Sequence, residues 1–209
     1  MSRSAKIIVY ARIVVTMPVE EIRSYLRRLR PYLIASLVLF AVGFVIGLMI
    51  VNRFPQMADT FEGSLAGFVK VFRGLPKLRL AAAIFLNNTV KTLMAILLGA
   101  LFGLVPALFL VVNGAALGVV LSLSTQSRGL SVSLLSVLPH GALELPAVFL
   151  GTAIGIMIGT SVTRKLFAKS ETKIGKELGG ALKFFCTVIV PLLFVAAFVE
   201  AYVTSTLVT

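Results

Sequence analysis

The sequence predicts an all-α fold, a polytopic membrane bundle of about five transmembrane helices. The chain of 209 residues is 58% hydrophobic and 13% charged, and its mean hydropathy is +1.03. A soluble domain carries about 25% charged residues, and none of this length buries so much apolar surface. Inside a bilayer every backbone polar group must be paired within the protein, which leaves helices or closed barrels. The apolar stretches far exceed ten residues and do not alternate, so the pattern favours helices.

A transmembrane helix needs about 20 mostly apolar residues. The apolar stretches predict spans at about 32–51, 81–104, 106–123, 142–162 and 182–207. Residues 81–123 are too long for one span, so we expect a turn at Pro106. All five spans belong to a single transmembrane domain, 31–209, and residues 164–180 are expected to form a basic loop before the last span.

Residues 1–30 are expected to be a basic amphipathic segment on the cytoplasmic side. Within it, residues 18–30 fit a helix whose apolar face is made by Val19, Ile22, Leu26 and Leu29. Such a helix either lies on an anionic membrane surface or packs on its own bundle. A second interfacial amphipathic helix is expected within 53–80, where the apolar residues at helical spacing are Phe61, Leu65, Phe68, Val69 and Phe72.

The apolar region 130–162 is interrupted by Pro139-His140-Gly141 and then by Pro146. One interpretation is a single long helix that its prolines kink. In the other, a half-helix ends just before Pro139, the chain breaks, and the fourth span begins after the break. We expect the second arrangement, a broken or re-entrant segment near Pro139 to Gly141, because it leaves a fourth span of about 20 residues.

Basic residues are distributed unevenly between the loops. Seven precede Pro31 and five lie between Arg164 and Lys176, whereas the other side has five in 53–80 and one at Arg128. Because cytoplasmic loops carry the excess of lysine and arginine, the N-terminus is expected in the cytoplasm and the C-terminus outside. The basic residues flank apolar runs, as in proteins that meet anionic lipid. The net charge of +12 therefore does not indicate a nucleic-acid partner.

Glycines four residues apart recur in the spans. The pairs and one triplet are Gly43/Gly47, Gly99/Gly103, Gly114/Gly118 and Gly151/Gly155/Gly159. Lipid provides no hydrophobic drive between helices, so close backbone approach at such positions holds spans together. The glycines serve packing within one subunit or a dimer interface, and the chain is expected to be a homodimer in the lipid bilayer.

Polar side chains at bilayer depth are costly, roughly 2.5–3.5 kcal/mol for a charge, so each needs a compensating group. Those expected inside the spans are Asn87, Asn88, Lys91, Asn113, His140, Glu144 and Glu200. His140 and Glu144 are four residues apart and share a helix face. Lys91 is expected to supply a cation to Glu144, and Asn113 to donate across a close helix contact. The cluster either lines a cavity for an ion, proton or polar substrate, or forms a buried network that fixes the register of the helices.

No residue pattern indicates an enzyme. The sequence has no nucleophile with an adjacent base, no phosphate-binding loop and no paired carboxylates. One histidine and one glutamate are too few ligands for a metal, and no cofactor is expected. The single cysteine, Cys186, excludes an internal disulfide.

Three stretches, LNNTVKTLMAILLGALFG, LVVNGAALGVVL and VLPHGALELPAVFLG, resemble the stage II sporulation protein M family of integral membrane proteins over roughly 86–163. The motif PHGALELP is their most specific part. The family's signature positions fall on Asn87, Asn88, Gly99, Asn113, Gly114, Pro139, His140, Gly141 and Glu144. The resemblance implies about five spans and a cytoplasmic N-terminus. In spore-forming bacteria the family member scaffolds a membrane complex during engulfment and recruits cell-wall hydrolases, and other members occur in organisms that never sporulate.

Two functional hypotheses follow. The resemblance implies a non-enzymatic membrane scaffold that binds a membrane or extracytoplasmic protein partner. The alternative is a small transporter or channel that uses the polar site around His140 and Glu144.

Overall fold

The computed structural model describes residues 17–54, 56, 74–168 and 173–204, without the side chains of 135–140, 143 and 203–204. Over these residues the chain is helical, with no strand. Five helical segments are long and apolar enough to cross a membrane: Val19–Arg53, Lys77–Ala100, Leu104–Arg128, Glu144–Phe167 and Ile174–Tyr202. The predicted bundle of five spans is confirmed. The apolar stripe expected between Phe61 and Phe72 lies outside the described residues.

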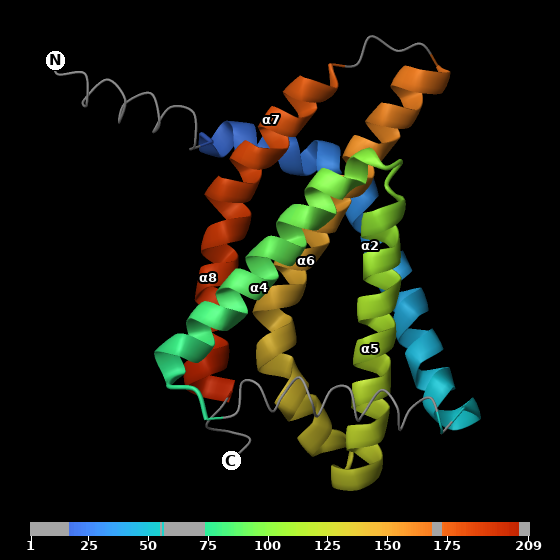
Figure 1. Cartoon of the computed structure of the whole chain (residues 1–209), viewed down its shortest axis with the longest axis vertical. Helices are drawn as coiled ribbons and strands as arrows, with labels where there is room; N and C mark the ends of the chain where they lie inside the picture. The colour runs from blue at the N-terminus through green and yellow to red at the C-terminus, as the bar shows by residue number, and fades with distance from the viewer. Residues whose placement is uncertain (1–16, 55, 57–73, 169–172, 205–209) are drawn as a thin grey trace, which may run out of the picture.

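Helix α2 (Val19–Arg53) joins the expected amphipathic segment and the first span in one element. Pro31 lies inside this helix, where a proline ring removes a backbone donor and bends the helix axis. In Figure 1 the first part of α2 crosses one end of the bundle, and the remainder turns to run along it. The boundary expected between 1–30 and 31–209 therefore falls within a bent helix.

Helices α4 (Lys77–Leu97) and α5 (Leu104–Arg128) are joined by the 3-10 turn η1 (Leu98–Ala100) and a left-handed pair of residues. Phe102 has a φ of 55° and Gly103 a φ of 74°, so the chain reverses a few residues before the predicted position. Pro106 instead lies in the first turn of α5, where its missing N–H removes no helical hydrogen bond.

The expected break in the fourth span is wrong. Helix α6 runs without interruption from Leu130 to Phe167, through both prolines. Each proline removes only one N–H donor, and Pro139 and Pro146 are two helical turns apart on one face, so their bends add in the same direction. Figure 1 shows the resulting curvature of α6. The single long helix, the interpretation that we did not prefer, is the arrangement found.

The last span is built from four consecutive elements. Helix α7 (Ile174–Phe184), the π-helical η2 (Phe185–Ile189), α8 (Val190–Val199) and the π-helical η3 (Glu200–Thr204) follow directly on one another. Pro191 is at the start of α8, and its missing donor explains why the preceding turn widens. Because α6 continues to Phe167 and α7 begins at Ile174, the basic loop predicted at 164–180 is largely helical.

Helix α6 is the centre of the bundle. In the membrane-spanning part of α6, 61% of the residues are buried, against 28–33% in the other four spans. It packs against α2, α4, α5 and α8. The outer faces of α2 and α4 carry exposed aliphatic side chains, among them Val38, Val42, Leu86 and Val90. These faces meet lipid or a partner, whereas the polar side chain of Thr152 on α6 is buried among protein.

Candidate functional site

The glycines of α2 and α5 bring these two helices into backbone contact. A Cβ added at any of four glycines would overlap the backbone of the facing helix. The contacts pair Gly43 with Val111, Gly47 with Ala115, Gly114 with Phe40 and Gly118 with Phe44. Residue numbers rise together in these pairs, so the helices run parallel. Small residues on both faces permit this approach.

Helices α4 and α6 form a second parallel pair of the same kind. Thr92 and Ala95 of α4 contact Gly151 and Gly155, and in the turn that follows Gly99 contacts Gly155 and Gly103 contacts Gly159. The seven glycines expected to pack helices in these segments (Gly99, Gly103, Gly114, Gly118, Gly151, Gly155 and Gly159) therefore lie against the chain's own helices. Packing within one subunit accounts for them, and the homodimer stays a prediction that these positions do not support.

The paired asparagines of α4 form one hydrogen-bonded unit. The Nδ2 of Asn87 donates to the Oδ1 of Asn88 at 3.0 Å. Asn88 is buried and Asn87 is half-buried. An amide pair inside the membrane satisfies part of its own hydrogen-bonding capacity, which reduces the cost of holding it there.

Glu144 lies in α6 at the N-terminal end of the fourth span and is half-buried. The backbone of His140 belongs to the same helix, but its side chain lies outside the described residues. The contact expected between them therefore stays a prediction. A Cβ added at Gly141 would meet only the Cδ1 of Leu145, at 3.5 Å, so close packing does not require a glycine there.

Lys91 does not lie level with Glu144. Because Thr92 contacts Gly151 and the helices are parallel, Lys91 is level with Leu150, roughly 9 Å along the axis from Glu144. Its side chain is exposed on the outside of the bundle. The expected pairing with Glu144 is wrong, because spacing along α4 does not show which way the residue faces.

Asn113 also acts differently from the expectation. Its Nδ2 donates to the carbonyl oxygen of Phe109 at 2.7 Å, one turn earlier in α5. The amide thus bonds to its own helix and does not donate across the contact that Gly114 makes with α2. Asn113 and Lys91 therefore do not converge with Glu144 on one site.

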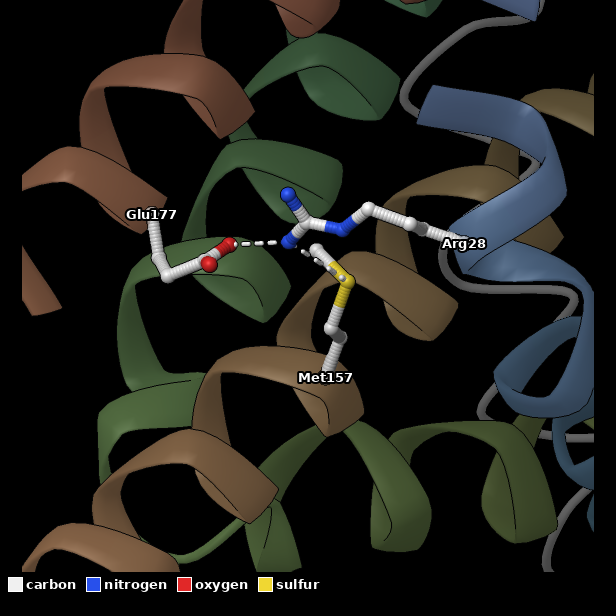
Figure 2. Close-up of polar contacts among 3 residues, drawn as sticks. All are labelled: Arg28, Met157 and Glu177. Carbon is white, nitrogen blue, oxygen red and sulfur yellow. Dashed lines mark hydrogen bonds and ion pairs between the residues drawn. The ribbon is translucent and has the colours of Figure 1, made fainter. Parts of the chain in front are cut away.

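A polar contact that the sequence did not reveal fixes the first part of α2 to the last span. The Nη2 of Arg28 lies 2.5 Å from the Oε2 of Glu177 on α7 and 3.9 Å from the Sδ of Met157 on α6. Figure 2 shows Arg28 reaching between these two helices. One residue of α2 thereby contacts both the centre of the bundle and its last span.

Three further contacts join residues 17–30, at the start of α2, to the beginning of the last span; we call this region the junction. Lys183 donates to the Oε2 of Glu21 at 2.9 Å, and the rings of Tyr25 and Phe184 stack with their centroids 4.8 Å apart. The backbone N–H of Met17 donates to the Oγ1 of Thr187 at 3.2 Å. Of the two alternatives for residues 18–30, packing on the bundle accounts for these contacts.

The sequence did hold one signal for the junction. The chain has only eight acidic residues, and four of them, Glu20, Glu21, Glu171 and Glu177, are in the basic segments 1–30 and 164–180. Acids placed among arginines and lysines indicate ion pairs between the segments. Among the residues that the structure describes, no three His, Cys, Asp or Glu side chains gather as metal ligands.

Comparisons with known proteins support the resemblance. A family model described as stage II sporulation protein M matches residues 36–205. A protein of Methanocaldococcus jannaschii, described as uncharacterized, is 29% identical over 180 residues, which cover 85% of this chain and 96% of that relative. No solved structure matches the chain. The family match begins within α2 just after Pro31, so it includes the α7 side of the junction and not the α2 side.

Proposed function

Because the chain belongs to the stage II sporulation protein M family, we propose that it is a non-enzymatic membrane scaffold that holds at least one protein partner at the bilayer. The observation that supports this most directly is the pair of backbone contacts α2–α5 and α4–α6. Helices that touch through glycine have little room to slide, because the cores they form are closely packed. A rigid bundle of this kind suits a protein that positions others.

Transport through the chain has less support. A transporter of this size needs its polar groups to converge on one path. Lys91 faces outward and Asn113 bonds to its own helix, which leaves the Asn87–Asn88 pair and Glu144 as the described polar groups of the expected site. We therefore retain the scaffold as the proposal.

The scaffold is tested by purifying the tagged chain from the membranes of its source organism. We expect a second membrane or extracytoplasmic protein to co-purify at a constant ratio through gel filtration. A Gly179→Ala variant should keep that protein, because a Cβ there meets no atom within 4 Å. A Gly155→Leu variant, in which α6 cannot approach α4, should lose it. Wild-type chain that elutes alone, even after cross-linking in the membrane, would contradict the proposal.

We also propose that the N-terminus is cytoplasmic and the C-terminus outside. The end of the bundle that carries the first part of α2, the end of α6 and the start of α7 holds most of the described basic residues, as cytoplasmic ends do. In a Cys186→Ser background, a cysteine replacing Gln126 should react in intact cells with a membrane-impermeant maleimide. One replacing Lys176 should not react, and the reverse pattern would refute the orientation.

A further inference from the structure

Lys91 is a charged side chain on the outside of the bundle at membrane depth. It lies on the helical stretch Lys77–Ala100, roughly 14 Å along the axis from one end and roughly 21 Å from the other. With a hydrocarbon core of about 30 Å, its Cα is roughly 11 Å from the nearer surface of that core. A lysine stem extends roughly 6 Å, so the ammonium group does not reach the headgroups by extension alone.

The face of α4 around Lys91 is otherwise apolar. Leu86, Val90 and Met94 are exposed beside it, and Asn87 lies one turn earlier on the same side. The ion pairs among the described residues join Arg23 to Glu20, Arg28 to Glu177 and Lys183 to Glu21. Within the part of the chain that the structure describes, Lys91 thus has no acidic partner. A charge in hydrocarbon is retained when something outside the helix compensates it.

A second copy of the chain does not supply that compensation from the described residues. The two acids in its described spans beyond the junction are Glu144, on the central helix α6, and Glu200, in η3 at the far end of the last span. Both are half-buried and lie nearer to the outer surface of the membrane than Lys91. Charge complementarity therefore favours an acidic group on a different protein.

We propose that the outer face of α4 around Lys91 is the docking site for a transmembrane helix of another protein, one that carries an aspartate or glutamate at the depth of Lys91. This inference rests on the proposed scaffold function and specifies its partner. The apolar residues beside Lys91 pack along the partner helix. The ion pair sets the depth of the partner helix in the membrane. It also selects that helix from other apolar helices, because a mismatched helix would leave a charge unpaired in hydrocarbon.

The chain contains no tryptophan, so a single one reports on this face. Met94→Trp places the indole one turn from Lys91, and the protein is reconstituted in vesicles of bromine-labelled phosphatidylcholine, which quenches tryptophan exposed to lipid. The probe is a synthetic leucine-rich transmembrane peptide with one central glutamate, added at pH 8. We expect it to protect the tryptophan, at a concentration about tenfold lower than the same peptide with a central leucine.

Matched variants separate the ion pair from general packing. Lys91→Met should remove the preference for the glutamate peptide, and Lys91→Arg should retain it. Val42→Trp, on the exposed face of α2, should stay quenched with either peptide. Equal protection by both peptides, or none by either, would overturn the site. Protection that grows with protein-to-lipid ratio in the absence of peptide would identify a second copy as the occupant, and would overturn it too.

This result and the co-purification result are independent. A partner that co-purifies with both wild-type chain and Lys91→Met leaves the scaffold standing and removes the docking site. If instead the chain purifies alone but binds the peptide in a glutamate-dependent way, the docking site stands and the scaffold proposal is removed.

Discussion

Gly155→Ala should destabilise the bundle by about 3 kcal/mol, and Gly155→Leu should prevent its assembly. A Cβ at this position would overlap the carbonyl oxygen of Ala95 and lie 3.0 Å from the Cγ of Pro106. The overlapping atom belongs to the backbone, so no side-chain rotation relieves it, and α4 must move away from α6. Overpacking of a closely packed core costs about 1–3 kcal/mol, and a rigid backbone neighbour places this site at the upper end. Unfolding by sodium dodecyl sulfate, followed by circular dichroism in mixed micelles, measures the loss.

The same substitution elsewhere in the chain provides the control. Gly175 and Gly179 lie in α7, and a Cβ at either position meets no atom within 4 Å. Alanine is the better helix former by about 1 kcal/mol, so Gly179→Ala should leave stability unchanged or raise it slightly. If Gly155→Ala and Gly179→Ala had the same effect, the contact between α4 and α6 would not be what joins these helices.

These glycines show which part of the helix packing could be predicted from the sequence alone. Their spacing identified the faces that approach closely, because residues four apart share a helix face. Spacing does not say which helix a face meets, so the pattern was compatible both with packing within the chain and with a dimer interface. The pairing of Gly99 with Gly155 follows only from three-dimensional register.

The predictions about the prolines of α6 and about the direction of the Lys91 side chain were wrong for a related reason. A proline kinks a helix or ends it according to whether neighbouring helices support the freed carbonyl, and that support is tertiary. Hydropathy placed Lys91 well inside the second span, and the structure has it within the helical stretch Lys77–Ala100. Its direction around the helix axis depends on how α4 packs, which a single apolar helix does not specify.

The apolar face expected for residues 18–30 is divided between the bundle and its surroundings. Val19 is 69% exposed and Leu26 is 37% exposed, whereas Tyr25 and Leu29 are buried. Val19, Ile22, Leu26 and Leu29 were expected to share one face, against either the membrane surface or the bundle. Next to a bilayer, aliphatic side chains are equally well placed against lipid. Leu29 packs in the same core cluster as Tyr25, Tyr25 stacks on Phe184, and Arg28 reaches Glu177.

Phe184→Ala should release the first part of α2 from the bundle. Phe184 is fully buried, and truncating a buried phenylalanine costs about 3–5 kcal/mol through lost burial and the cavity left behind. Its ring is also the surface on which Tyr25 stacks. The flanking ion pairs are partly exposed to solvent and so weak that they do not hold the junction alone.

Trypsin reports on this release, because the undocked segment offers Arg23, Arg27 and Arg28 as cleavage sites. In Phe184→Ala, we expect rapid cleavage within residues 23–30 while the spans after Pro31 stay protected by the micelle, and a lower midpoint of thermal unfolding. Phe167→Ala is the matched control, since Phe167 is 77% exposed at the end of α6 and its loss should change neither readout. Cleavage of Phe184→Ala at the wild-type rate would show that α2 is held along its length after the bend. The Phe184 ring would then not be what protects this segment from local unfolding and cleavage, because a segment held by that ring is cleaved faster once the ring is removed.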